Sequence, residues 1–464
     1  MNAQKKLGLG SGVAVCMGLI VATSCLVSLG QGFGLAGNSF IIALAIVVVL
    51  NSFIGISFAE LNRMMPDVTG GLGQYMLVGL GPWASIMSNI SAYFITQVLA
   101  SSVELAMCGI VISGLFPSVP PLVFSVAVLL ILFVLNLFGV DIFAKVQNIT
   151  VILLIGSMAV LGIIGFFKLG SGVPITAAEY APPMGGIADA VSLSAIAFWL
   201  FIGVEFIIPV AKDMKNSKRN VLLSMILALI ILFVVQSVLG MGMSNYVSTE
   251  VLLSAEMPHI AYAENLIGRP GVIWMSIVTI LAAVSTLNTV LPATGKILQG
   301  MAEEKMVPSP LIKMNKKNVP WLGMLVVVVL DMVMLLSGFV NSSGLINIIL
   351  AGSCFWIASY TLTHLNVLAL RKRYPNAMRS KNLVLAGVPQ AIGIVGCVYM
   401  IWNIASDPGD RALIYKIFGI LFAILAVYAF VWVKAVLKTN PFRPVYIGTM
   451  NVDKTVLPKV KTSL

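Results

Sequence analysis

Two glutamates stand inside long apolar stretches, where an ionisable side chain is costly to place. Glu104 lies in the stretch 84–113, and Glu205 lies in the stretch 190–211, directly after a Phe-Ile-Gly-Val segment. A charged group at the centre of a bilayer costs about 3 kcal/mol on insertion scales, so such residues usually face a cavity or a partner. Each glutamate is therefore a candidate for binding a cation or carrying a proton. The alternative for each is a neutral acid that is hydrogen-bonded to backbone or between helices.

Hydroxyl, aromatic and glycine residues supply the remaining candidates for binding a small molecule. Thr23 and Ser24 offer hydrogen-bond donors, and the indole of Trp199 suits an ammonium group or an apolar side chain. The alternatives are hydroxyls that bond to their own helix and an indole that only packs. The predicted substrate-binding residues are Ala22, Thr23, Ser24, Ser101, Glu104, Trp199, Phe201 and Gly203, and the predicted coupling or gating residues are Glu205 and Glu104.

Other chemistry has little support in the sequence. Ser285 and Thr286 are candidate ligands for an ion, with ordinary hydroxyl capping as the alternative. The chain has no Walker loop, no HExxH motif and only two histidines. Its five cysteines fall within apolar stretches, where packing is the expected role. We therefore expect no metal site, no cofactor and no enzymatic activity.

The apolar stretches that carry these residues are long enough to cross a membrane. The 464 residues are 59% hydrophobic and 10% charged, with a mean hydropathy of +1.02, which excludes a water-soluble protein. About 20 helical residues cross a hydrocarbon layer of ~30 Å, and barrel strands would alternate instead. The sequence predicts an all-α integral membrane protein with about twelve transmembrane helices, near 11–34, 40–60, 84–113, 121–139, 146–167, 190–211, 220–244, 271–298, 321–340, 344–370, 383–405 and 411–434.

The first and sixth stretches carry residues that favour an interrupted helix. The first ends in a Gly-rich segment up to Gly37, and the sixth contains Gly203 and Pro209. One interrupted helix in each half is typical of inverted-repeat carriers, although Gly and Pro are also common in ordinary membrane helices. This pairing predicts an N-terminal segment 1–10, a ten-helix inverted-repeat core 11–370, two additional helices 371–434 and a tail 435–464.

The positive charge of the chain indicates its orientation in the membrane. The net charge is +11, and Lys and Arg concentrate in cytoplasmic loops of membrane proteins. With the N-terminus in the cytoplasm, all but four of the 28 Lys and Arg lie on that side; the four are Lys168, Arg269, Arg411 and Lys416. We predict a multi-pass protein of the cell (plasma or inner) membrane with both termini cytoplasmic, and we expect no nucleic-acid partner.

Several ordered motifs resemble those of the amino acid, polyamine and organocation (APC) permeases. Ala59-Glu60-Leu61, Pro66, Gly70-Gly71, Tyr75, Gly81 and Trp83 resemble the AEL, P, GG, Y and GxxxGW pattern. The segment from Trp199 to Glu205 and the segment from Lys215 to Asn220 resemble WxFxGxE and KNPxRN. The segment from Met301 to Pro308 is similar to MAxDGxxP. These motifs follow one another through roughly residues 11 to 375.

The resemblance implies a LeuT-like five-plus-five inverted-repeat fold, alternating access and a central site between spans one, three, six, eight and ten. It implies that Glu205 couples substrate occupancy to proton state or closure. The family usually has Gly-Ser-Gly at the first break, where exposed amides bind the substrate carboxylate; this chain has Ala22-Thr23-Ser24 instead, so carboxylate binding stays open. Proton-coupled relatives carry a lysine in the fifth span, where this chain has Leu154.

The expected function is secondary transport of amino acids, by exchange or by proton-coupled symport. The alternative is a carrier or antiporter for polyamines or other organic amines, which Glu104, Glu205 and the missing glycines favour. A non-transporting membrane sensor is a remote alternative. The expected partners are an amino acid or amine, the lipid bilayer, and protons or sodium.

Overall fold

The described part of the chain consists of helices and their connections. A computed structural model describes residues 7–66, 68, 71–338, 345–375, 387–405 and 407–449. Within these ranges there is no strand, and one isolated bridge pairs Leu7 with Met214. The expected all-α class is confirmed.

The helices of the first half run from α1 to α8. They are α1 (Leu9–Ile20), α2 (Thr23–Ala36), α3 (Phe40–Met64), α4 (Leu72–Gly79), α5 (Pro82–Ile90), α6 (Thr96–Leu115), α7 (Pro121–Asn136) and α8 (Val140–Phe166), with a 3₁₀ turn η1 (Gly37–Ser39) after α2 and a π-helical turn η2 (Ser91–Ile95) between α5 and α6.

The helices of the second half begin after a long connection. They are α9 (Ile187–Ser192), α10 (Ser194–Trp199), the 3₁₀ helix η3 (Val204–Asp213), α11 (Ser217–Tyr246), α12 (Thr249–Ser254), α13 (Pro258–Ile267), α14 (Arg269–Glu303), η4 (Ser309–Ile312), α15 (Trp321–Leu336), α16 (Leu345–Arg373), α17 (Val388–Trp402) and α18 (Pro408–Trp432), followed by the π-helical turn η6 (Val433–Leu437) and the 3₁₀ turn η7 (Ile447–Thr449).

Seven helical segments among the described residues are long and apolar enough to cross a membrane. They are Thr23–Met64, Pro82–Leu115, Asp141–Phe166, Ser194–Asp213, Ser217–Tyr246, Arg269–Glu303 and Pro408–Leu437. Shorter apolar helices are Leu9–Ile20, Pro121–Asn136, Trp321–Leu336 and Val388–Trp402. Outward-facing side chains are apolar and exposed, such as Ile152 at 71% and Val395 at 69%, as lipid contact requires. The count of twelve spans stays a prediction.

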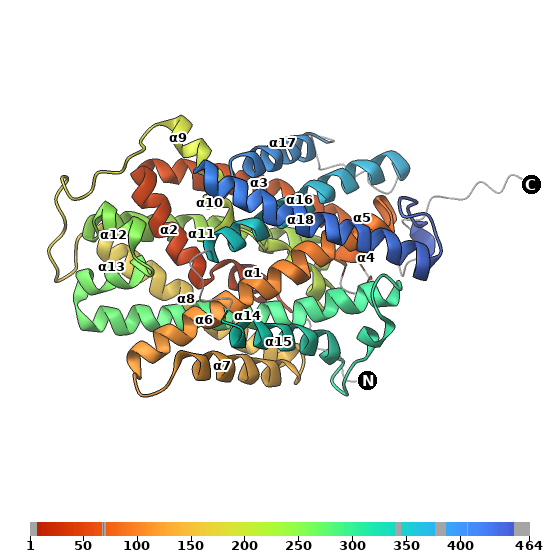
Figure 1. Cartoon of the computed structure of the whole chain (residues 1–464), viewed down its shortest axis with the longest axis horizontal. Coiled ribbons are helices and arrows are strands. Elements are labelled where there is room, and N and C mark those ends of the chain that lie inside the picture. The colour runs from red at the N-terminus through yellow and green to blue at the C-terminus, as the bar shows by residue number, and fades with distance from the viewer. Residues whose placement is uncertain are drawn as a thin grey trace, which may run out of the picture.

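The helices form one bundle whose long core members pack side by side. The helix α11 packs on α8 and α3, and α14 packs on α8 and α6. The helices α17 and α18 both pack on α16. In Figure 1, α12 and α13 lie at one end of the bundle and α4 lies at the other.

The first predicted span is broken between α1 and α2. Val21 (ψ 80°) leaves the helical conformation and Ala22 is extended. Carbonyl groups that the break frees need other donors inside a membrane protein. The carbonyls of Gly18 and Leu19 accept hydrogen bonds from the Thr286 hydroxyl at 3.4 and 3.3 Å.

The sixth predicted span is broken between α10 and η3. Gly203 has φ +106°, a conformation that favours glycine, and a Cβ there would lie 2.2 Å from Leu19 Cδ2. Side-chain amides donate to the freed carbonyls: Gln236 to Leu200 at 3.1 Å and Asn51 to Phe201 at 3.0 Å. Both expected interruptions are confirmed.

The prolines and scattered charges of the tail predict a solvated segment, but the described part of the tail packs on the bundle. The amide of Trp83 donates to the Pro441 carbonyl at 3.0 Å, and the Val445 amide donates to Leu77 at 3.2 Å. Ile447 is fully buried. Apolar side chains among the prolines account for this packing.

Candidate substrate-binding site

Glu104 lies at the break of the first span. Its Oε2 accepts the backbone N–H of Thr23 at 2.6 Å, and its Oε1 accepts the N–H of Ser24 at 3.0 Å. These amides begin α2 and have no partner within the helix. Glu104, from α6, is 1% exposed. A carboxylate at a helix N-terminus is favoured by the helix dipole, so Glu104 joins α6 to the break.

Trp199 joins the two broken spans. Its Nε1 donates to Ser24 Oγ at 3.0 Å, and its carbonyl accepts the Cys25 thiol at 3.4 Å. The Thr23 hydroxyl reaches the Thr279 carbonyl of α14 at 3.4 Å. The hydroxyls of the first break therefore bond to other spans rather than to their own helix.

Glu205 is held by α16. Trp356 Nε1 and the Tyr360 hydroxyl each donate to one Glu205 oxygen at 2.6 Å. Tyr360 also accepts the Gly203 amide at 3.2 Å, and Glu205 is fully buried. Glu104 of α6 thus contacts the broken first span. Glu205 belongs to the broken sixth span and contacts α16.

A small cavity of about 20 Å³ lies between the breaks, which is room for about one water molecule. The lining comes from both broken spans, α6, α14 and α16. It comprises Leu19, Ile20, Ala22, Cys25, Gln97, Ala100, Glu104, Trp199, Ile202, Thr286 and Trp356. Four sequence candidates, namely Ala22, Glu104, Trp199 and Thr286, therefore meet at one cavity.

Other candidates lie outside that lining. The Ser101 hydroxyl donates to Asp331 Oδ1 of α15 at 2.7 Å. Phe201 is fully buried, and Gly203 contributes its amide to Tyr360. The structure therefore does not bring Ser101 to the break that Glu104 caps.

Ser285 and Thr286 lie beside Gln147 and the first span. Gln147 Nε2 donates to Ser285 Oγ at 2.9 Å and to the Ala14 carbonyl at 3.3 Å. A Cβ at Gly18 would lie 1.4 Å from that nitrogen, so the glycine makes room for the amide. The described residues contain no cluster of three His, Cys, Asp or Glu able to hold a metal.

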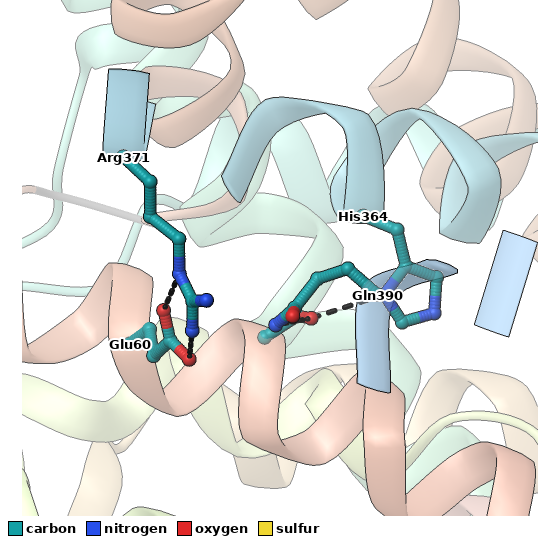
Figure 2. A network of polar contacts seen from close by, with 5 residues as sticks. Glu60, His364, Arg371 and Gln390 are labelled. Carbon is teal, nitrogen blue, oxygen red and sulfur yellow. Dashed lines mark hydrogen bonds and ion pairs between the residues drawn. The ribbon is translucent and has the colours of Figure 1, made fainter. Parts of the chain in front are cut away.

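Polar contacts join α3, α16 and α17. Arg371 forms a two-point ion pair with Glu60, with Nε to Oε2 at 3.0 Å. Figure 2 shows this pair beside His364 and Gln390, and the latter two bond to Ser57 at 3.0 and 3.1 Å.

A second ion pair joins the broken sixth span to α14. Lys296 Nζ lies 2.7 Å from Asp213 Oδ2 at the end of η3. Both residues line a cavity of about 370 Å³.

Sequence reasoning missed Trp356, Tyr360, Gln97 and the contacts of Gln147. Trp356 and Tyr360 are four residues apart and share one helix face, so their spacing was a usable signal of a common partner. The partner itself, Glu205, lies 151 residues away from Trp356, and no local pattern reports that distance.

Comparisons with known proteins agree with this architecture. The amino acid permease family model matches residues 12–443. The L-asparagine permease of Escherichia coli (strain K12) is 26% identical over 380 residues, covering 77% of this chain and 74% of that protein. The gamma-aminobutyric acid permease of Bacillus subtilis (strain 168) is 24% identical over 321 residues, covering 65% and 66%.

A solved structure extends the comparison to the fold. The Eremococcus coleocola manganese transporter matches with a TM-score of 0.61 and 14% identity, over 92% of this chain and 94% of that one. The expected LeuT-like fold with broken first and sixth spans is confirmed. The family match spans nearly the whole chain, and the protein is a membrane-embedded member of the amino acid permease family.

Proposed function

We propose that this protein is a secondary transporter that carries amino acids or closely related amines by alternating access, with both termini cytoplasmic. The observation that carries the proposal is the meeting of two broken helices around one buried cavity, joined by the Trp199–Ser24 hydrogen bond. Interrupted helices at the middle of a bundle expose backbone groups to a ligand, and rocking of one repeat against the other exposes that ligand to each side.

Contacts between elements that move apart in such a cycle would act as gates. The Lys296–Asp213 ion pair joins the broken sixth span to α14. The Glu60–Arg371 ion pair joins α3 to α16. Glu205 joins η3 to α16 through Trp356. We assign the coupling role to Glu205, because its contacts must change when η3 moves relative to α16.

Sodium coupling has less support than exchange or proton coupling. A sodium site between the first and eighth spans would need the oxygen atoms of Ser285 and the first-span carbonyls as ligands. The Gln147 amide already donates to Ser285 and Ala14, and Thr286 uses its hydroxyl on Gly18 and Leu19. A hydrogen-bond donor therefore takes the position of a cation.

Counterflow in proteoliposomes tests the proposed function. Vesicles with purified full-length protein are loaded with one unlabelled solute from a panel of amino acids and their decarboxylated amines, and uptake of the same labelled solute is followed. We expect saturable uptake that internal solute stimulates, without ATP. Protein-free vesicles are the control. Uptake that never exceeds that control for any panel member would contradict transport and favour the sensor alternative.

A further inference from the structure

We propose that Glu104 is a built-in carboxylate that fills the anion-binding amides of the first break, so that the cavity selects an organic ammonium ion without a carboxylate. This inference rests on the proposed transport function and names the substrate class of the same site.

The first step concerns the amides at the start of α2. In broken-helix transporters, a half-helix N-terminus is the place where an anionic substrate group binds. The amides of Thr23 and Ser24 both donate to Glu104, at 2.6 and 3.0 Å. A substrate carboxylate could bind them only by displacing a side chain that is itself buried.

The second step concerns the other donors around the cavity. The indole N–H of Trp199 is used by Ser24, and that of Trp356 is used by Glu205. The lining, all from described residues, includes no Lys, Arg or His. Burying a substrate carboxylate against these groups would leave its charge without a partner, which is strongly unfavourable.

The third step concerns the charge of Glu104 itself. Each of its oxygens accepts one N–H and keeps further lone-pair positions. A primary ammonium group supplies donors for those positions, and its positive charge would favour the ionised form of Glu104. The faces of Trp199 and Trp356, both in the lining, favour the same cation.

The fourth step concerns the size of the amine and the number of its ammonium groups. The rest of the lining beside Glu104 is largely apolar, including Leu19, Ile20 and Ile202. The cavity has room for about one water molecule, so a short hydrocarbon tail would enter it only as the two broken spans move apart. The second buried acid, Glu205, is bonded to Trp356 and Tyr360 and is not part of the cavity lining, so a second ammonium group meets no further acid there. The geometry favours a small monoamine over a polyamine.

Matched pairs of ligands test the assignment. Valine with isobutylamine, leucine with isoamylamine, and phenylalanine with phenethylamine differ within each pair only by the carboxylate. Binding to the purified full-length protein is measured by isothermal titration and by thermal shift. We expect the amine of at least one pair to bind at least tenfold more tightly than its amino acid.

Variants at Glu104 give opposite expected results. Glu104→Gln keeps the side-chain shape and removes the charge, so amine affinity should fall at least tenfold without any gain for the amino acid. Glu104→Ala frees the amides of Thr23 and Ser24, so the preference should move toward the amino acid. Asp331→Asn is the matched control, because Asp331 is a buried acid that bonds to Ser101 and Ser102 outside the cavity, and it should leave the preference unchanged.

The outcomes separate this inference from the proposed function. A wild-type protein that transports and binds the amino acid more tightly than the amine overturns the assignment of Glu104 while transport stands. Unchanged amine affinity in Glu104→Gln overturns it as well, even if Glu104→Ala does not fold. Absence of both binding and counterflow for all three pairs counts against the inference and the proposed function together.

Discussion

Glu205 and Trp356 form a 2.6 Å hydrogen bond that ties the broken sixth span to α16. Tyr360, one turn along α16, donates to the other Glu205 oxygen at the same distance. The backbone of the break is tied to the same helix, because the Gly203 amide donates to Tyr360. Movement of η3 relative to α16 must therefore break or exchange the contacts of one acid.

The first prediction is that Glu205→Gln retains substrate binding and loses the pH dependence of transport. Glutamine cannot release or take up a proton in the working range, so a rate that depends on Glu205 becomes flat with pH. Exchange in proteoliposomes is measured between about pH 5 and pH 8, a range that a perturbed buried carboxylate can cover. Tyr360→Phe, which keeps the acid, is the control and should retain a pH-dependent rate. A Glu205→Gln profile with the wild-type shape would move the proton site to Glu104.

The second prediction is that Gly203→Leu abolishes transport while the protein still inserts in the membrane. The residue has φ +106°, and its Cβ would collide with Leu19 across the breaks. Uptake and surface expression are measured together. Gly156→Leu is the matched control, because no heavy atom lies within 4 Å of a Cβ there, and it should transport normally. Normal uptake by Gly203→Leu would remove the sixth break from the transport path.

The third prediction is that transport does not require sodium. Replacing external Na⁺ with K⁺ should change the initial uptake rate less than about twofold, since the Gln147 amide donates to the oxygens that a sodium ion would need. The measurement is made without a membrane potential, so that the cation identity is the only variable. Saturable stimulation by Na⁺ would instead make Ser285 and Thr286 ion ligands.

The fourth prediction concerns orientation in the membrane. Single cysteines at Lys215 and Lys316 should be labelled only from the cytoplasm, and those at Glu179 and Glu256 only from outside. All four positions are exposed, whereas the five native cysteines are buried and give a low background. Labelling of position 316 by an impermeant maleimide in intact cells would reverse the assigned topology. The predicted cytoplasmic position of Lys5 lies outside the described residues.

The fifth prediction concerns the Glu60–Arg371 ion pair. Arg371→Met leaves Glu60, whose side chain is 4% exposed, without its partner, and breaking a buried pair from one side costs about 3–5 kcal/mol. A lower midpoint of thermal unfolding in detergent is the expected result. The double variant Glu60→Met with Arg371→Met should recover most of the loss, since no buried charge is left alone. Equal midpoints for wild type and Arg371→Met would contradict this prediction, because they would show that water stabilises the Glu60 carboxylate without Arg371.

The sequence by itself determined the class of the protein and the positions where its helices break. Apolar length and low charge require membrane helices, because each polar backbone group in lipid must be bonded within its own segment. Gly203 marked the sixth break, since its positive φ is a local property of one residue. The first break, at Val21 and Ala22, carries no glycine, and the sequence indicated it through the Gly-rich end of the first stretch, its pairing with the sixth stretch and the family resemblance at Ala22-Thr23-Ser24.

Only the tertiary structure decided which polar groups meet. Glu104 and Ser101 are neighbours on α6, yet Glu104 caps α2 whereas Ser101 bonds to Asp331 of α15. A helix turns by about 100° per residue, so residues three apart differ in direction by about 60°. That difference is enough for the two side chains to meet different helices, and the partner of each depends on which helix packs beside it. The contact between Glu104 and Thr23 joins residues 81 positions apart; it follows from the packing of α6 against the first break, which no local sequence pattern encodes.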